Sequence, residues 1–401
     1  MLTEGGWVAS WARSAFEGVQ SPGFPSYGDA GVANETLRQV FPLSVGGELL
    51  RVRLTNLIGG HPVIFDEITA ARAGMGATLA GPPTKITFGG ANYVEIPTGA
   101  EVLSDPFRSP TADLEGLTID LYIDKSTGAP TRSDWLFGFG ELPPDELLPE
   151  EIPDQIRPAA FSAPGNWAGS PMSDRFRPIP FEGFVAAIDV LDRSTIGTVV
   201  IMGDSTTVNY PPFLASRAAR HDPRLAVVNA GVCGNRMLTS SPGRGGAGLA
   251  RFPHDALLVT GARSVIAMWI NDLGMSDLLS SGAPAGMPKI TAAHTDANDL
   301  IAGWRQLITR AHSQHLPLIA GTTPPFKGAF YWTADKEKER QRLNAWIRTS
   351  GEPDGIADFD QALRDPGDRE QLAPRYHMGD FLHPSPAGSR AMADCIDLSQ
   401  C

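Results

Sequence analysis

Apolar and polar residues alternate in short runs through the first half of the chain. Residues 36–56 hold two such runs on either side of a Val-Gly-Gly-Glu turn. In the second run, Leu50, Val52 and Leu54 would face one side of a strand, and the polar residues beside them would face the other. The pattern predicts a β-hairpin with one buried face.

The same alternation recurs further along this half, in short runs at 85–97, 100–107 and 117–124. Short strands with turn residues between them are typical of a β-sandwich. An acidic, Pro-rich stretch follows at about 138–180, and we expect it to be a surface loop. These features predict an all-β, jelly-roll-like sandwich domain over residues 1–192.

The period changes in the second half, where apolar runs alternate with segments of helical spacing. The strand-like runs stand at 198–202, 225–230, 262–270, 316–323 and 355–359. The helical segments stand at 211–221, 297–314, 336–350 and 385–398. Apolar strands that alternate with helices predict a parallel sheet covered on both faces. We therefore expect a flavodoxin-like three-layer α/β/α domain over residues 193–401.

Composition and charge narrow the class of protein. The 401 residues are 42% apolar and 19% charged, which is typical of a folded globular chain. The 43 glycines and 34 prolines indicate many turns and loops. The net charge of −12, with no cluster of Lys or Arg to offset it, would repel phosphate backbones. We expect no nucleic-acid partner.

Neither the N-terminal residues nor the cysteines identify the cellular compartment of the protein. No apolar run reaches the roughly 18 residues that a membrane span needs. The N-terminus lacks the basic start and apolar core of a signal peptide, so we expect a soluble protein, cytoplasmic or exported with its signal removed. Cys395 and Cys401 could close a disulfide in an exported protein or remain two thiols. No Cys/His cluster has metal-ligand spacing, and we expect no metal or cofactor.

Polar residues and glycines gather just after the predicted parallel strands. Ser205 follows the first strand, Gly234 the second, Asn271 the third and Thr323 the fourth, and His383 precedes the last helix. Ligands of open α/β sheets bind beyond the carboxyl ends of the strands. The sequence therefore predicts a site at this edge of the sheet.

The residue types at this edge fit acyl transfer, which needs a nucleophile, a base, a group that orients the base, and oxyanion donors. Ser205 is the candidate nucleophile and His383 the candidate base. Asp380, three residues earlier on the same tight loop, could hold one ring nitrogen of His383. The candidate oxyanion donors are the backbone N–H groups of Ser205 and Gly234 and the side-chain amide of Asn271.

Each of these residues also has a plain structural explanation. Ser205 could cap the next helix, and Asp380 could cap the last one. Asn271 could be a turn residue, and Gly234 could serve only a positive φ. Their occurrence in order, each beside a strand end, favours catalysis.

Four sequence blocks carry a resemblance to a known family: Gly-Asp-Ser at 203–205, Val-Cys-Gly-Asn-Arg at 232–236, Ile-Asn-Asp at 270–272 and Asp-Phe-Leu-His at 380–383. They resemble the four signature blocks of the SGNH (GDSL-type) hydrolases. The resemblance implies the three-layer fold and ester cleavage by a serine nucleophile. It maps Ser205 to the nucleophile, Gly234 and Asn271 to the oxyanion donors, His383 to the base and Asp380 to its partner.

The resemblance extends into the first half of the chain. Residues 6–12, 36–40 and 51–56 are similar to the β-domain of one SGNH subgroup, some of whose members act on acetylated carbohydrates. Such a domain could bind sugars, cover the active site with its loops, or mediate a homodimer.

Two residues depart from the family pattern. Thr206 replaces the leucine of the first block, and Trp269 stands where the third block has glycine. We expect Trp269 to border the substrate pocket, together with Asn235 and Thr323. Asp204 could border the pocket too, although we expect it mainly to fix the strand-end loop by hydrogen bonds.

The sequence predicts a metal-independent serine esterase that acts through an acyl-enzyme on short-acyl, mainly acetyl, esters of carbohydrates. Three alternatives stay open. The protein could be a carboxylesterase for small or aromatic-alcohol esters, an acyltransferase to a sugar hydroxyl, or a catalytically silent carbohydrate-binding protein.

Overall fold

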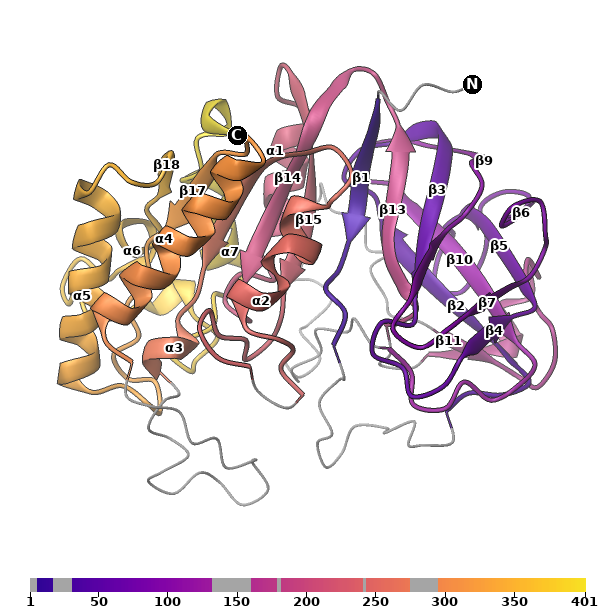
Figure 1. Cartoon of the computed structure of the whole chain (residues 1–401), viewed down its shortest axis with the longest axis horizontal. Helices are drawn as coiled ribbons and strands as arrows, with labels where there is room; N and C mark the ends of the chain where they lie inside the picture. The colour runs from indigo at the N-terminus through magenta and orange to yellow at the C-terminus, as the bar shows by residue number, and fades with distance from the viewer. Residues whose placement is uncertain (1–5, 17–30, 132–159, 179–181, 241–242, 275–294) are drawn as a thin grey trace. The chain divides into compact units, whose positions relative to one another are not determined.

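A computed structural model describes the chain at residues 6–16, 31–131, 160–178, 182–240, 243–274 and 295–401. It divides the chain into two compact units (Figure 1). The first comprises Met1–Ile196 and Asp222–Ala226, and the second Gly197–His221 and Val227–Cys401. No helix of the described residues is long and apolar enough to cross a membrane.

The first unit is built from antiparallel sheets. One sheet has the order β1 (Trp7–Ala12), β13 (Val185–Leu191), β3 (Gly47–Thr55) and β8 (Glu101–Leu103), with β9 (Phe107–Thr111) also paired to β3. The other has the order β12 (Phe176–Pro178), β11 (Ala160–Ser162), β2 (Glu35–Pro42), β10 (Gly116–Ile123), β5 (Glu67–Arg72) and β6 (Thr84–Lys85). A small sheet pairs β4 (Val63–Phe65) with β7 (Val94–Ile96). The predicted β-rich unit is confirmed.

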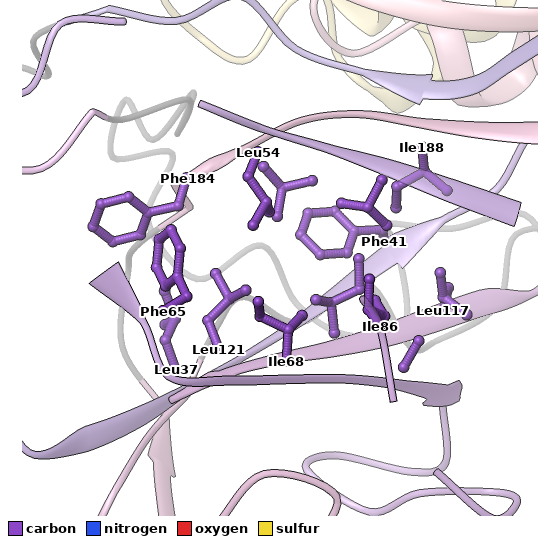
Figure 2. Close-up of a cluster of buried hydrophobic side chains, with 14 of the residues drawn as sticks. Leu37, Phe41, Leu54, Phe65, Ile68, Ile86, Leu117, Leu121, Phe184 and Ile188 are labelled. Atoms are coloured by element: carbon purple, nitrogen blue, oxygen red, sulfur yellow. The ribbon is translucent and has the colours of Figure 1, made fainter. Parts of the chain in front are cut away.

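The core of this unit lies between its sheets (Figure 2). Phe41 and Leu121 come from one sheet, and Leu54 and Ile188 come from the other; all four side chains are fully buried. The inward residues of β3 alternate with partly exposed ones, as the sequence predicts. Burial of these apolar faces is the main favourable term in the stability of a sandwich.

The predicted hairpin at residues 36–56 is wrong. Strand β2 pairs with β10 and β11, whereas β3 pairs with β13, β8 and β9, so the two runs belong to different sheets. Leu43 and Val45, in the turn between them, are buried. Alternation reports that a strand has a buried face, but it does not say which strand is its neighbour.

The predicted surface loop at 138–180 is wrong in part. Residues 138–159 and 179–180 lie outside the described residues. However, Ala160–Ser162 and Phe176–Pro178 are the paired strands β11 and β12, and β11 adds to the edge of β2. Edge strands tolerate proline, because an outward N–H needs no ladder partner, and Pro178 ends such a strand.

The second unit contains a parallel sheet with the order β15 (Arg224–Gly231), β14 (Thr195–Gly203), β16 (Ala262–Met268), β17 (Leu318–Gly321) and β18 (Gly355–Ala357). The registers of β14 with β16, β16 with β17 and β17 with β18 are parallel. The inner strands are buried along nearly their whole length, which explains their unbroken apolar runs. This order confirms the predicted flavodoxin-like sheet.

Helices cover this sheet on both faces (Figure 1). The α-helices are α1 (Pro211–Ala219), α2 (Gly248–Phe252), α3 (Asn271–Gly274), α4 (Ala297–Ser313), α5 (Ala334–Thr349), α6 (Phe359–Leu363) and α7 (Pro386–Asp394). Short helical turns lie at Ser173–Arg175, Pro253–Leu257, Pro374–Tyr376 and Leu398–Gln400. Helices α2, α4 and α5 pack on one another, and α1, α6 and α7 form a second group.

Capping side chains fix where the longer helices start. Asp296 caps α4 and forms a capping box with Asp299. Ser385 caps α7, and Pro386 occupies its first turn. The cap of α7 therefore lies two residues after His383, and the helix starts at the next residue.

Candidate active site

The strand order creates a switch point between β14 and β16. Strand β14 lies between β15 and β16. The chain therefore continues from β14 to β15 on one side and then crosses to β16 on the other side. Gly203 and Met268 are paired at the ends of the two strands, and the residues that follow them lie side by side. The crevice beyond such a switch point is where open α/β sheets bind ligands.

Asp204 fixes the two strand ends to each other. Its carboxylate is fully buried and accepts the backbone N–H groups of Ile270 (2.8 Å) and Asn271 (3.4 Å). It also accepts the backbone N–H (2.9 Å) and the hydroxyl (2.7 Å) of Thr206. Burial raises the pKa of Asp204, although these hydrogen bonds oppose the shift. The expectation that Asp204 fixes the loop by hydrogen bonds is confirmed.

Ser205, His383 and Asp380 form a hydrogen-bonded chain. The Ser205 Oγ lies 2.9 Å from the His383 Nε2, and the His383 Nδ1 lies 2.5 Å from an Asp380 oxygen. Ser205 is buried, and the side chain of His383 is 16% exposed. The sequence placed these three residues in one site, and the structure brings them together.

Asp380 is held as a carboxylate. Its second oxygen accepts the backbone N–H groups of Leu382 and His383, at 3.0 Å each. Burial alone would raise the pKa of Asp380, but the hydrogen bonds and charge of His383 outweigh it and lower the pKa to about 2. A carboxylate ionised at neutral pH can orient the His383 ring and stabilise its protonated form.

Asn271 and Gly234 lie in the segments that follow β16 and β15. Asn271 is the first residue of α3, and its amide nitrogen donates one hydrogen bond to the Asn235 carbonyl (3.1 Å). Gly234 has a φ of +70°, and a Cβ there would lie 2.7 Å from the Arg244 side chain. The positive φ favours glycine at this position, whereas the contact is with the end of a flexible side chain that can shift.

Asn235 connects three segments of the site. Its side-chain oxygen accepts the Trp269 indole N–H (3.1 Å) and two N–H groups of Arg251 (3.1 and 3.0 Å). Its amide donates to the carbonyls of Arg244 and Gly246, at 2.8 Å each. Through these hydrogen bonds, the buried Asn235 side chain holds the block at 232–236 against the block at 270–272.

Arg251, on α2, is a residue that sequence reasoning missed. Besides Asn235, its guanidinium reaches the Gly203 carbonyl at the end of β14 (2.9 Å) and the Ala230 carbonyl in β15 (2.6 Å). It also pairs with Asp255 at 3.0 Å. An arginine in a short helical segment normally lies at the surface, so no sequence signal indicates this role.

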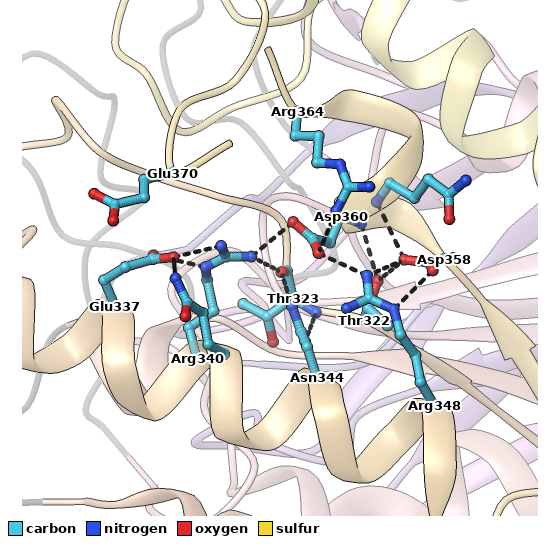
Figure 3. A network of polar contacts seen from close by, with 12 residues as sticks. Thr322, Thr323, Glu337, Arg340, Asn344, Arg348, Asp358, Asp360, Arg364 and Glu370 are labelled. Atoms are coloured by element: carbon cyan, nitrogen blue, oxygen red, sulfur yellow. Dashed lines mark hydrogen bonds and ion pairs between the residues drawn. The ribbon is translucent and has the colours of Figure 1, made fainter. Parts of the chain in front are cut away.

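Thr323 belongs to a polar network behind β17 (Figure 3). Its backbone N–H donates to Asn344 (2.8 Å), and its carbonyl accepts from Arg340 (2.9 Å). Arg340 is buried between the carboxylates of Glu337 and Asp360. The Thr323 hydroxyl donates to the Trp269 carbonyl at 3.4 Å, which connects this network to the loop of Asn271.

The four residues expected to border the pocket have contacts within the protein. Trp269 is 4% exposed and packs edge-on against Trp304 with ring centroids 6.2 Å apart, while Asp204, Asn235 and Thr323 are at most 1% exposed. Their hydrogen bonds described above are all to protein groups. All four side chains are thus packed within the protein, and their contact with substrate stays a prediction.

Cys395 and Cys401 are thiols not joined by a disulfide, and burial raises their pKa values to about 12 and about 11. Within the part of the chain that the structure describes, no three His, Cys, Asp or Glu side chains gather to hold a metal ion.

The sheet and the residues at its edge define a three-layer α/β/α domain of the SGNH hydrolase fold. Residues 201–391 match the model of the GDSL-like lipase/acylhydrolase family, so this part of the chain is a member of that family and the protein is a hydrolase. The match includes all four sequence blocks. No curated protein matches the chain.

Several solved structures also match the second half. A GDSL-like lipase from Bacteroides thetaiotaomicron is 18% identical, with 51% of this chain and 87% of that chain covered and a TM-score of 0.37. A variant of an acetyl xylan esterase from Geobacillus stearothermophilus is 18% identical, with 50% and 92% covered and a TM-score of 0.37. An α/β hydrolase from the metagenome of Lake Arreo is 18% identical, with 50% and 94% covered and a TM-score of 0.38.

Proposed function

We propose that this hydrolase is a serine esterase in which Ser205 is the nucleophile, His383 the general base and Asp380 the group that orients the base. One observation carries the proposal. The Ser205 Oγ is 2.9 Å from one nitrogen of His383, while the other nitrogen of the same ring is 2.5 Å from Asp380. This arrangement leaves His383 able to accept the serine proton as the Oγ attacks an ester carbonyl.

The negative charge that develops on the carbonyl oxygen requires donors. We assign this role to the backbone N–H groups of Ser205 and Gly234 and to the Asn271 amide. The Asn271 amide has two hydrogens and gives only one to Asn235, so the second can serve the oxyanion. His383 then returns the proton to the leaving alkoxide, and water, activated by the same ring, releases the acid from the acyl-enzyme.

The substrates we propose are short-acyl, mainly acetyl, esters of carbohydrates. The burial of Ser205 favours a small acyl group. Ile270 and Leu382, the neighbours of Asn271 and His383, pack in one apolar cluster with Tyr331. The similarity of the N-terminal motifs to a subgroup with members active on acetylated carbohydrates supports a sugar as the alcohol.

An aromatic alcohol is a second candidate, because aromatic side chains lie beside the base. Phe381 precedes Leu382 and His383, and its ring packs against Gly328 in the loop after β17. In the same loop Phe330 is 66% exposed and contacts Tyr331 edge-on, with ring centroids 4.7 Å apart. Aromatic faces of this kind can stack on an aryl ring as well as on a sugar.

The test compares the full chain with its Ser205→Ala variant on p-nitrophenyl acetate. The variant should lose at least about 10³-fold in kcat. Ser399→Ala, which removes a hydroxyl from the C-terminal turn, is the matched control and should match the wild type. Near-full turnover by Ser205→Ala would overturn the proposed nucleophile.

The substrate class needs a separate comparison. Acetyl-xylan and acetylated pectin fragments should be deacetylated faster than aryl and alkyl esters, with acetate as the product. Faster turnover of the aryl esters would favour the second candidate. If an added sugar acceptor becomes acetylated in place of water, the protein is an acyltransferase with the same residues. A chain that turns over none of these esters would be a silent binding protein.

A further inference from the structure

The loop that carries Asp380 and His383 is closed by backbone pairing. His377 and Pro384 form an isolated antiparallel bridge. Inside the bridge, the Met378 N–H donates to the His383 carbonyl at 3.0 Å. The acid and the imidazole therefore lie within one short closed loop, and the shape of that loop sets their mutual direction.

Two side chains accept the N–H groups of this loop. Asp380 accepts the two that follow Phe381, as described above. The His377 Nδ1 accepts two more, from Gly379 at 3.0 Å and from Phe381 at 3.3 Å. The N–H groups on either side of Asp380 in the sequence are thus held by the same imidazole nitrogen.

Phe381 has a backbone conformation that a side chain disfavours. Its φ is +60°, in the left-handed region, which costs roughly 1–2 kcal/mol for a residue other than glycine. The His377 ring stacks on the Phe381 ring with centroids 4.5 Å apart and an angle of 28°. His377 therefore contacts this strained residue through both its backbone and its ring.

The hydrogen bonds define the form of His377. A ring nitrogen that accepts N–H groups must keep its lone pair, so the Nδ1 carries no proton and the proton of the neutral ring is on Nε2. His383 differs, because its Nδ1 faces the Asp380 carboxylate and its Nε2 faces Ser205. One histidine of the loop is an acceptor for the backbone, and the other is placed to move a proton.

We propose that His377 is a positioning residue: by accepting the Gly379 and Phe381 N–H groups, it fixes the direction in which Asp380 presents its carboxylate to His383. The inference rests on the proposed function of Ser205, Asp380 and His383. Without the acceptor, two N–H groups lose their partner and Phe381 is freer to return to a common φ. Asp380, between those two residues, would then turn away from His383.

Two substitutions test separately the hydrogen-bond acceptor and the aromatic ring of His377. His377→Asn keeps an acceptor at the position of Nδ1 but removes the ring, and His377→Phe keeps a ring but removes the acceptor. On p-nitrophenyl acetate, His377→Phe should lower kcat by about 10- to 100-fold with KM within about twofold, since misplacing a reacting group by about 1 Å costs up to about 100-fold. His377→Asn should retain at least about a third of the wild-type kcat. A His377→Phe kcat equal to wild type, or an equal loss in both variants, would overturn the proposal.

A spectroscopic readout separates this proposal from that of the nucleophile. The proton between the His383 Nδ1 and Asp380 should give a far-downfield ¹H signal, which Asp380→Asn would assign by removing it. The signal should persist in His377→Asn and Ser205→Ala, and shift or vanish in His377→Phe. An unchanged signal in His377→Phe refutes the positioning role whatever Ser205 does. A lost signal in His377→Phe, together with full turnover by Ser205→Ala, refutes the nucleophile alone.

If circular dichroism shows that the His377→Phe variant is unfolded, His377→Leu replaces it with the same expectations.

Discussion

Ser205 and His383 are 178 positions apart in the sequence, yet their side chains lie within hydrogen-bond distance. The backbone achieves this, since Ser205 follows β14 and His383 lies two residues before the cap of α7. Asp380 adds an ionised carboxylate supplied from the same loop as His383.

Asp380→Asn should lower kcat by up to about 10⁴-fold while the protein stays folded. The amide has the shape of the carboxylate but can donate a hydrogen to His383, which favours the wrong tautomer of the ring. Asp397→Asn, at the cap of the C-terminal turn, is the matched control and should leave kcat unchanged. Steady-state kinetics on p-nitrophenyl acetate measures both. A loss below about threefold in Asp380→Asn would show that this carboxylate does not orient His383.

At the level of elements, the short helix α2 holds the ends of two strands in place. Arg251 on α2 donates to carbonyls of β14 and β15 and to the side chain of Asn235, which in turn accepts the Trp269 indole. Burial opposes a charged guanidinium and lowers the pKa of Arg251, and Asp255 partly offsets this. The Arg251 guanidinium stays charged in the core because these hydrogen-bond acceptors stabilise its charge.

Arg251→Met should lower the free energy of unfolding by roughly 3 kcal/mol or more, because it removes a buried cation from Asp255 and from the strand ends. Chemical denaturation of the full chain measures this change. Arg305→Met is the matched control, since its ion pair with Glu352 is exposed to solvent, and it should have little effect. Equal stability of the two variants would show that the Arg251 contacts do not support the fold.

Some elements could be predicted from the sequence and others could not, for physical reasons. The parallel strands were predictable because burial on both faces leaves an unbroken apolar run, as in β14. The partner of β2 was not, since pairing depends on contacts far away in the sequence. Likewise, Ser205, Asp380 and His383 stand in short motifs, whereas Arg251 and His377 act through backbone groups whose positions only the fold defines.

At the scale of the whole molecule, stability depends on pH through a buried carboxyl group. Asp272 is 2% exposed and accepts the backbone N–H groups of Met237 (2.7 Å) and Leu238 (3.0 Å). Burial raises its pKa to about 6, although these hydrogen bonds and Arg236 oppose the shift. The folded protein thus binds a proton near pH 5 that the unfolded chain does not.

The sign follows from linkage. A carboxyl group with a raised pKa in the folded state contributes stability below its unfolded pKa of 3.8, and this contribution is lost as the pH rises to about 6. The wild type should therefore gain about 1 kcal/mol over Asp272→Asn when the pH falls from 7 to 5. Denaturation curves of both proteins at the two pH values measure this gain. A difference that does not change with pH would show that Asp272 stays ionised.

The central claim is that Ser205 is the nucleophile of this hydrolase, and covalent labelling tests it most directly. A fluorophosphonate probe is added to the full chain, and the modified peptide is located by mass spectrometry. We predict a single adduct on Ser205, absent in Ser205→Ala and formed much more slowly in His383→Ala. An adduct on another residue, or undiminished labelling of Ser205→Ala, would contradict the account.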